Sequence, residues 1–159
     1  MPWAAGHSRE QTAGFLARCE RDWATGDAYE YAITADGLTV GSCGLIRRIR
    51  HGGLKIGYWL SPTRTGRGLA TSAAAALTIQ AFALPGMERV EIHHAKANIA
   101  SEAVPGRLGF TRVESRPASP TFAPAGSKAN VIWRMEREAL RSREWKRRLS
   151  PQEAPGVGH

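Results

Sequence analysis

Residues 54–84 read LKIGYWLSPTRTGRGLATSAAAALTIQAFAL, and this stretch decides the fold class. Its first seven residues predict a strand, which ends at Pro62 because proline has no backbone N–H to give to a ladder. A glycine-rich loop then leads into an alanine-rich helix over residues 69–84, which Pro85 closes. A strand, a loop and a long helix in direct succession indicate a mixed α/β domain.

The sequence on either side of this unit adds further helices and strands. Ser8 begins a capping box and Gly26 is a stop signal, so we expect a helix between them. Alternating apolar residues on both sides of Asp36-Gly37 predict a β-hairpin. Further strands are expected at residues 89–95, 110–115 and 130–136, a short helix at 98–108 and a loop at 116–128. The order predicts an α/β (α+β) fold.

Apolar periodicity predicts which helix faces are buried. In the N-terminal helix, Phe15, Leu16, Cys19 and Trp23 recur at helical spacing. The helix over residues 69–84 is apolar on two sides, so we expect it to be well buried. One side carries Leu69, Ala73, Leu77 and Ala81, and the other carries Ala75, Ile79 and Phe82.

Length and composition exclude several classes of protein. The chain has 159 residues, the usual size of one domain, and 42% are hydrophobic. It has no apolar run of about 18 residues, which predicts no membrane span, and its N-terminus lacks a signal-peptide pattern. Cys19 and Cys43 form no CxxC pair, so we expect idle thiols in a cytoplasmic protein. No His/Cys/Asp cluster has metal-ligand spacing, so no metal is expected.

The net charge of +8 is concentrated near the C-terminus. Residues 137–149 carry six Arg and Lys against two Glu, or +4, half of the total. Without a nucleic-acid-binding motif, such a segment is typical of a solvated face. We therefore divide the chain into a domain over residues 1–137 and a basic helix with a disordered tail over 138–159.

The glycine-rich loop fits a phosphate site. Gly66 and Gly68 come just before the helix, whose N-terminal N–H groups carry a partial charge of roughly +0.5 e. Arg64 and Arg67 add charges that could pair with phosphates. A plain strand-to-helix turn fits the same residues, so the loop alone leaves both interpretations open. The dinucleotide pattern G-x-G-x-x-G is not met, because Thr71 replaces the third glycine.

Four short motifs follow one another in a fixed order. They are residues 56–62 (IGYWLSP), residues 66–70 (GRGLA), Asn98-x-x-Ser101 and residues 108–110 (LGF). This series resembles the GNAT acetyltransferase superfamily, and most closely its RimJ/RimL-like branch of ribosomal-protein N-terminal acetyltransferases. The resemblance covers roughly residues 3–137. It implies a mixed, mostly antiparallel twisted sheet flanked by helices, and an acetyl-CoA site.

The resemblance also implies how acetyl-CoA is held. The family's loop Q/R-x-x-G-x-G/A falls on Thr65, Gly68 and Ala70, and Thr65 departs from the usual Gln or Arg. The family's preceding strand splays from its neighbour and pairs with the pantetheine arm, which implies this role for residues 58–60. For Trp59, a place in the core is the alternative. The residues expected at the cofactor are Tyr58, Trp59, Leu60, Arg64, Thr65, Gly66, Arg67, Gly68, Leu69, Ala70, Asn98 and Ser101.

Acyl transfer from a thioester to an amine needs a base, an oxyanion donor and a proton for the leaving thiolate. The tyrosine that many members use as the acid is absent, which leaves Ser101, with a helix N-cap as its alternative role. Glu91 and His93 share one strand face and are the base candidates, with His94 on the other face. A histidine satisfied within the sheet is the alternative. Lys55 stands where related sequences often have an acid.

The family normally begins with a strand and a helix before the region that starts here. The resemblance therefore implies an N-terminally truncated domain. Losing an edge strand exposes unpaired backbone groups. A homodimer is our hypothesis for how they are covered.

Together these observations predict an acetyl-CoA-dependent N-acetyltransferase. Its acceptor is a primary amine, on a protein N-terminus or a small molecule, and transfer is direct. The alternative is a non-catalytic acyl-CoA-binding or regulatory module, which the absent tyrosine and Lys55 favour. A third reading, a basic ribosome- or RNA-associated protein, rests on the basic residues after 137.

Overall fold

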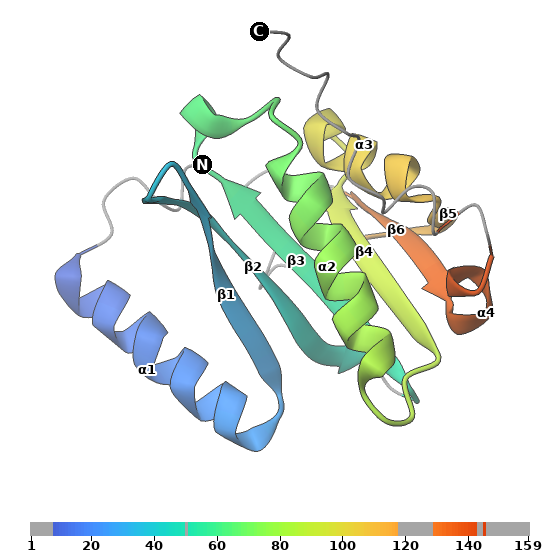
Figure 1. Ribbon diagram of the computed structural model, residues 1–159, viewed down its shortest axis with the longest axis horizontal. Coiled ribbons are helices and arrows are strands. Elements are labelled where there is room, and N and C mark those ends of the chain that lie inside the picture. Colours follow the sequence, from blue (N-terminus) through green and yellow to red (C-terminus); the bar gives the residue numbers. More distant parts are fainter. Residues whose placement is uncertain (1–7, 50, 118–128, 143–144, 146–159) are drawn as a thin grey trace, which may run out of the picture.

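The computed structural model describes residues 8–49, 51–117, 129–142 and 145 (Figure 1). The helices are α1 (Arg9–Thr25), α2 (Leu69–Ala83), α3 (Ile99–Leu108) and α4 (Arg137–Leu140), with a 3-10 turn at Pro62–Arg64. The strands are β1 (Ala28–Ala35), β2 (Leu38–Ile49), β3 (Gly53–Leu60), β4 (Arg89–Ala95), β5 (Thr111–Pro117) and β6 (Ala129–Glu136). Each helix and strand predicted between residues 8 and 136 is confirmed, while the basic helix expected after residue 137 stays a prediction. Most of the predicted loop lies outside the described residues.

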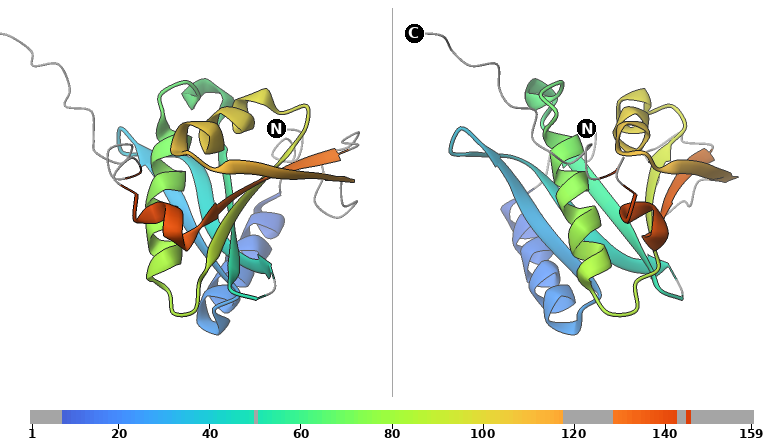
Figure 2. Two further views of the ribbon diagram at one scale, coloured as in Figure 1. Left: turned by 90° about the vertical axis from the view of Figure 1, so that its right-hand side faces the viewer. Right: turned by 45° about the vertical axis from the view of Figure 1, so that its right-hand side comes forward.

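The six strands form one sheet in the order β1-β2-β3-β4-β6-β5. All neighbours are antiparallel except β3 and β4, which α2 connects and which are therefore parallel. Helix α2 covers one face of the sheet, and α1 lies against the other face beside β1 (Figure 2). The mixed, mostly antiparallel sheet flanked by helices is thus confirmed.

Local signals explain the first elements. The Ser8 hydroxyl accepts from the Gln11 backbone N–H, and the Gln11 side chain accepts from the Ser8 N–H, which completes the capping box. Gly26 ends α1 with φ of 75°. Asp36 and Gly37 both have positive φ, 53° and 74°, as the two-residue hairpin turn requires.

The core lies between α2 and the sheet. Leu77 and Phe82 of α2 are buried in one hydrophobic cluster with Ile56 and Ile92 of the central strands. The expected burial of both sides of α2 is wrong, because 42% of Ile79 is exposed while Thr78 is fully buried. One sheet can cover only one face of a helix. Thr78 tolerates burial because its hydroxyl donates to the Ala74 carbonyl at 2.7 Å.

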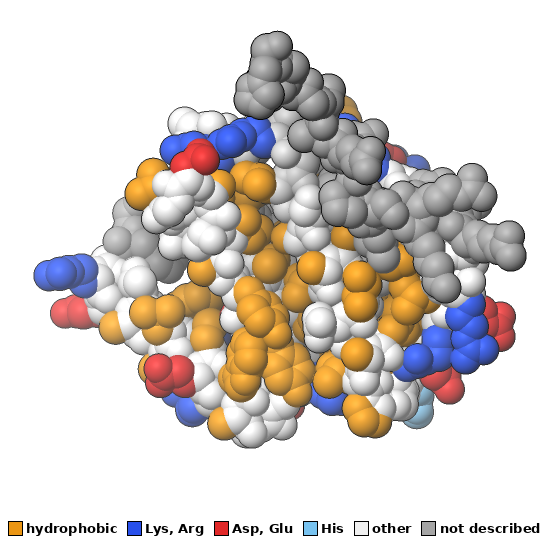
Figure 3. All heavy atoms as spheres, in the orientation of Figure 1, with side chains coloured by type: hydrophobic (Ala, Val, Ile, Leu, Met, Phe, Trp, Pro, Cys, Tyr) orange, Lys and Arg blue, Asp and Glu red, His pale blue; other side chains and the backbone are white. Residues whose placement is uncertain are grey.

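The apolar residues of α1 form a face that is only partly covered. No residue of α1 is buried, and Leu16 and Trp23 are 56% and 46% exposed. The helix contacts mainly the edge strand β1, so much of its apolar face overhangs a groove. Figure 3 shows hydrophobic side chains across the surface between α1 and α2.

The parallel strands β3 and β4 pair over only part of their length. Their register runs from Gly53↔Arg89 to Ile56↔Ile92 and stops there. The last four residues of β3, numbers 57–60, remain beside β2 alone, with Gly41↔Leu60 as the last pair. In the described chain, the edge of these four residues that faces β4 therefore carries no ladder.

The described residues that follow β6 pack on the core. Arg137 donates to the carbonyl oxygens of Met87 at 2.7 Å and Phe82 at 2.8 Å, so it ties the end of α2 to β6. Leu140 packs against the core, and Trp145 is 4% exposed. The division at residue 137 stays a prediction, and the expected disordered tail lies outside the described residues. No described helix has the length and apolar character needed to cross a membrane.

Candidate active site

The loop between β3 and α2 needs glycine at two positions. Gly66 and Gly68 have φ of 79° and 74°, a region that residues with a Cβ rarely adopt. Gly68 is also the N-cap of α2, and no described side chain caps this helix. The first N–H groups of α2 therefore remain for solvent or a ligand, and a diphosphate suits them.

A cavity of about 390 Å³ runs from this loop to α3. It is lined by Tyr58, Trp59, Leu60, Pro62, Thr65, Gly66, Gly68, Leu69, Ala70, Thr71, Asn98, Ala100, Ser101, Val104 and Arg107. The cavity brings together all the residues expected at the cofactor except Arg64 and Arg67. It includes the part of β3 whose edge facing β4 is not paired with any described strand. We call it the cofactor cavity.

The two arginines of the loop lie elsewhere. Arg64 and Arg67 each place a guanidinium nitrogen 3.2 Å from the Asp36 carboxylate, at the tip of the β1–β2 hairpin. Neither lines the cofactor cavity, so their contact with phosphates stays a prediction. Arg107 does line it, from the last turn of α3. A basic residue in the last turn of a helix gives no sequence signal of its own, because it is common there.

Ser101 lies in the first turn of α3, and its backbone N–H donates to the Asn98 side chain at 3.2 Å. Asn98 is the N-cap, so the N-cap alternative for Ser101 is wrong. The Tyr58 hydroxyl donates to the Ser101 carbonyl oxygen at 3.1 Å. This carbonyl needs an outside donor because Pro105, four residues on, has no N–H to give it.

Tyr58 therefore holds α3 against β3 at the cofactor cavity. Burial raises the pKa of Tyr58 above its ordinary value, and the hydrogen bond to Ser101 offsets this only in part. The hydroxyl keeps its proton and remains a donor at neutral pH. A tyrosine hydroxyl thus reaches the site from β3. The sequence predicted Tyr58 at the cofactor through its strand, but it did not predict this use of the side chain. The available signal was Pro105, four residues after Ser101, which leaves the Ser101 carbonyl in need of a donor from another element.

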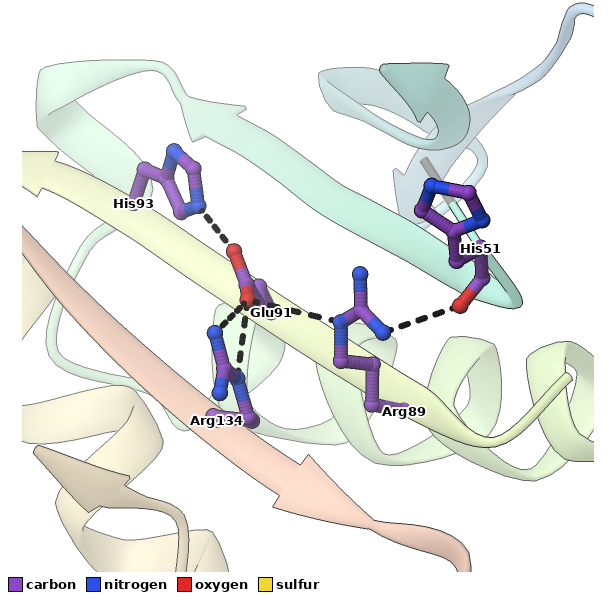
Figure 4. A network of polar contacts seen from close by, with 5 residues as sticks. All are labelled: His51, Arg89, Glu91, His93 and Arg134. Carbon is purple, nitrogen blue, oxygen red and sulfur yellow. Dashed lines mark hydrogen bonds and ion pairs between the residues drawn. The ribbon is translucent and has the colours of Figure 1, made fainter. Parts of the chain in front are cut away.

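Glu91 is the centre of a charged network on the α1 side of the sheet (Figure 4). Its carboxylate accepts a hydrogen bond from Arg134 Nε at 2.9 Å and forms an ion pair with Arg134 Nη2 at 2.7 Å. It also contacts His93 Nε2 at 2.7 Å and has Arg89 Nε at 3.9 Å. Only 4% of Glu91 is exposed. Burial raises its pKa, but the hydrogen bonds from His93 and Arg134 lower it by more, and the pKa lies below its ordinary value. An ionised carboxylate bound in this way is a weak base.

His93 is better placed for proton transfer. It follows Ile92, the last residue of β4 in register with β3, and so lies where the strands separate. Glu91 holds one ring nitrogen, and the other points away from the carboxylate (Figure 4). A carboxylate that orients a histidine in this way leaves the second nitrogen for a substrate. The geometry therefore favours His93 as the base, with Glu91 positioning it.

The second histidine of β4 belongs to the sheet. His94 Nδ1 donates to the Ala95 carbonyl at 2.9 Å, and its Nε2 accepts from Trp133 Nε1 at 3.0 Å. Both ring nitrogens are used and the residue is buried. Trp59, by contrast, is half-buried and lines the cofactor cavity as well as the groove beneath α1. Its alternative as a core residue is not favoured.

The profile of the acetyltransferase (GNAT) domain matches residues 1–111. The chain belongs to the GNAT acetyltransferase family. It is 33% identical over 91 residues to the "Putative ribosomal N-acetyltransferase YdaF" of Bacillus subtilis, a match covering 57% of this chain and 46% of YdaF. The chain thus spans about half the length of this curated relative.

Solved GNAT structures have the same fold. Mycobacterium smegmatis RimJ in complex with CoA-disulfide superimposes with a TM-score of 0.76 and 22% identity, over 89% of this chain and 68% of RimJ. The Salmonella typhimurium enzyme that modifies the N-terminal serine of ribosomal protein L7/L12 gives 0.70 and 21%, over 82% and 76%. At these identities the likeness shows the fold alone. In this GNAT chain the glycine loop, the separated strands and α3 surround one cavity.

Proposed function

We propose that this GNAT domain moves the acetyl group of acetyl-CoA directly to a primary amine. The observation that carries the proposal is the cofactor cavity, where the glycine loop, the unpaired edge of β3 and Ser101 meet. The family assignment and the coenzyme A in the RimJ structure support it. The acceptor is an amine on a protein N-terminus or a small molecule. The names of YdaF and of the Salmonella typhimurium enzyme with the same fold as this chain favour a ribosomal protein.

The cavity offers groups for each part of acetyl-CoA. The N–H groups at the start of α2 suit the diphosphate, and Gly66 and Gly68 let the backbone approach it. The unpaired edge of residues 58–60 suits the amides of the pantetheine arm. A backbone N–H near Trp59 suits the thioester oxygen, whose negative charge grows during the reaction. The two loop arginines, now beside Asp36, would have to turn to reach a phosphate.

Two proton transfers of the reaction use different residues, His93 for the amine and Ser101 for the leaving thiolate. His93, oriented by Glu91, takes a proton from the amine nitrogen. The nitrogen bonds to the acetyl carbon, the carbon–sulfur bond breaks, and the thiolate takes up a proton through the Ser101 hydroxyl, which regains one from solvent. The nitrogen loses its second proton to solvent, so an ammonium and acetyl-CoA give the acetamide, the CoA thiol and one released proton. Tyr58 contributes by fixing the first turn of α3.

An acyl-cysteine step has little support. Burial and the nearby Glu30 raise the pKa of Cys43, and burial also raises the pKa of Cys19. Both thiols therefore stay protonated near neutral pH, and a thiol is a poor nucleophile. This favours transfer of the acetyl group directly from acetyl-CoA to the amine. Two free cysteines also fit a reducing compartment such as the cytoplasm, which we include in the proposal.

Release of free thiol from acetyl-CoA in the presence of a panel of amines tests this function. We expect turnover with at least one amine. His93→Gln and Ser101→Ala should each lower kcat by about 10²-fold or more, with the Kd of acetyl-CoA unchanged. Ser72→Ala, on the exposed side of α2, and His51→Asn, at an exposed turn, are matched controls.

Two results separate the alternatives. If acetyl-CoA raises the melting temperature but no thiol is released with any amine of the panel, the protein is a non-catalytic acyl-CoA-binding module. If acetyl-CoA does not change the melting temperature, the cofactor assignment itself is wrong.

A further inference from the structure

Four residues lie in one row across the α1 side of the sheet. The register pairs Glu30 of β1 with Gly44 of β2, and Gly44 with Gly57 of β3. His93 of β4 comes next, immediately after the last β3–β4 pair. The row has a carboxylate at one end, an imidazole at the other and two glycines between them. We call these four residues the glycine trough.

The Glu30 carboxylate lies over the first glycine. A Cβ added to Gly44 would stand 2.6–2.7 Å from its carboxyl carbon and both oxygens, closer than real contacts allow. The Ser42 hydroxyl donates to one of these oxygens at 3.3 Å. Glycine at position 44 therefore lets the half-buried Glu30 reach into the trough. A side chain there would push the carboxylate out.

The second glycine has open space above it. A Cβ added to Gly57 would have only Ile46 Cδ1 within 4 Å, at an ordinary contact distance of 3.8 Å. A cavity of about 200 Å³ occupies this position, lined by Phe15, Glu30, Ser42, Gly57, Tyr58 and Trp59. It shares four of these residues with the groove of about 440 Å³ beneath α1. The trough is thus a small site with an apolar roof.

The trough and the cofactor cavity meet at β3. Tyr58 and Trp59 line both the cofactor cavity and the cavity above Gly57. A thioester held at the unpaired edge of these residues would be within reach from the trough. The row that contains Glu30, Gly57 and His93 therefore leads to the position from which an amine must attack the thioester.

We propose that the glycine trough is the acceptor site and that it takes a primary ammonium with one positive charge next to an apolar group. This inference rests on the proposed function. Glu30 binds the ammonium, and Phe15, Leu16 and Trp59 contact the apolar group. Glu30 is the one carboxylate among the described residues that line either cavity, so a polyamine would leave its other charges without a partner.

The reaction balances within the trough. The ammonium gives one proton to His93, the neutral nitrogen bonds to the acetyl carbon, and the carbon–sulfur bond breaks. The nitrogen then loses a second proton, the thiolate takes one up through Ser101 in the cofactor cavity, and His93 passes the remaining proton to solvent. Glu30 changes neither its bonds nor its proton, so it is a binding and positioning residue. Its loss should change KM for the amine more than kcat.

Steady-state kinetics with three amines test the assignment. The probes are 2-phenylethylamine, a phenylalanine-initiated dipeptide amide and spermidine. Glu30→Gln should raise KM for the preferred amine by about 10- to 100-fold, because a charge-assisted hydrogen bond is lost. KM for acetyl-CoA should not change. Glu20→Gln on the exposed side of α1 makes the same charge change away from the cavities and is the control.

Two glycine variants test the shape of the site. Gly57→Ala adds a methyl group to the open space and meets no close atom, so the fold should survive while the amine KM rises. Gly44→Ala displaces the Glu30 carboxylate and should resemble Glu30→Gln. An amine KM within twofold of wild type in folded Glu30→Gln and Gly57→Ala would overturn the proposal.

Amine binding measured by calorimetry, with the protein saturated with CoA, separates this inference from the proposed function. Wild type should bind the preferred probe, and Glu30→Gln should bind it at least about tenfold more weakly. Binding of this kind without turnover would support the glycine trough as an amine-binding site and contradict the proposed enzymatic function. Preference for phenylethylamine indicates a free amine as the source, and preference for the dipeptide amide indicates a protein N-terminus. Preference for spermidine over both overturns the single-charge assignment.

Discussion

At the scale of single residues, Glu91 determines what its neighbours can do. Its buried carboxylate receives one hydrogen bond and one ion-pair contact from Arg134, and a third contact from His93. A sequence pattern can show that Glu91 and His93 share a strand face, but it cannot show which of them is free to exchange a proton. That depends on Arg134, which β6 brings alongside β4 from more than forty positions away.

The Glu91 pair predicts a dependence of stability on pH. The pKa of Glu91 lies below its ordinary value, so the stability it adds is present above the unfolded pKa of about 4.3. That stability is lost as the pH falls through the folded pKa. We expect Glu91→Gln to lower the free energy of unfolding at pH 7 by about 1–3 kcal/mol. The difference from wild type should shrink at pH 3.

Urea unfolding at both pH values measures this difference. Glu20→Gln, an exposed residue of α1, should change stability by less than about 0.5 kcal/mol at either pH. A Glu91→Gln difference that is the same at pH 7 and pH 3 would show that the charge of Glu91 is not the source.

At the scale of elements, α3 is held to β3 by a hydrogen bond that a proline makes necessary. Pro105 leaves the Ser101 carbonyl without a helical donor, and the Tyr58 hydroxyl takes that place. We expect Tyr58→Phe to cost about 1 kcal/mol of stability, because it leaves a partly buried acceptor without a donor. In a Pro105→Ala background, which restores the helical N–H, the cost of Tyr58→Phe should fall markedly.

A double-mutant cycle in urea measures this coupling. Equal costs of Tyr58→Phe in both backgrounds would mean that the two groups act independently. Acetyl-CoA affinity measured on the same four proteins tells whether the position of α3 matters for binding as well as for stability.

The loop before α2 is an element whose glycines are fixed by backbone conformation. Gly68 has φ of 74°, and a Cβ added there would meet no atom within 4 Å. Gly68→Ala should therefore lose about 1–2 kcal/mol through backbone strain rather than through a clash. The loop should also hold acetyl-CoA less tightly. Gly14→Ala, within helix α1 and equally free of contacts, is the control and should be neutral or stabilising.

Urea unfolding and acetyl-CoA titration are the two measurements. If Gly68→Ala keeps both stability and affinity, the left-handed conformation of the loop has no role in the site.

At the scale of the whole molecule, β1 is an edge strand with apolar side chains around it. In the described part of the chain it pairs only with β2, and Tyr31 and Leu38 are 41% and 56% exposed. Trp23 packs edge-on against Tyr29 and Tyr31 at the same edge. An unpaired apolar edge tends to pair with another chain.

This edge leads to our hypothesis of a homodimer. Light scattering should give the mass of two chains, and Tyr31→Lys should shift the mass towards one chain, because edge lysines block strand pairing. Lys96→Ala, at an exposed position away from β1, should leave the mass unchanged. A single species at monomer mass for the wild type would contradict the hypothesis.

Much of the fold could be predicted because its signals are local. The capping box at Ser8, the turn at Asp36-Gly37 and the glycine before α2 each specify a backbone conformation through neighbouring residues alone. The burial of Ile79 was mispredicted because a hydrophobic pattern cannot tell how many layers will cover a helix. Arg107 was missed for a related reason, since its place in the site depends on where α3 packs.

The sequence by itself determined the order of elements, the glycine loop and the family, since these depend on residue types at fixed spacing. Only the tertiary structure decided that β3 and β4 separate after Ile56, that Tyr58 reaches Ser101, and that two glycines lie in the row between Glu30 and His93. The residues of that row come from four strands. Their alignment is set by sheet register, a non-local property that brings Glu30 and His93, 63 positions apart in the sequence, into one row.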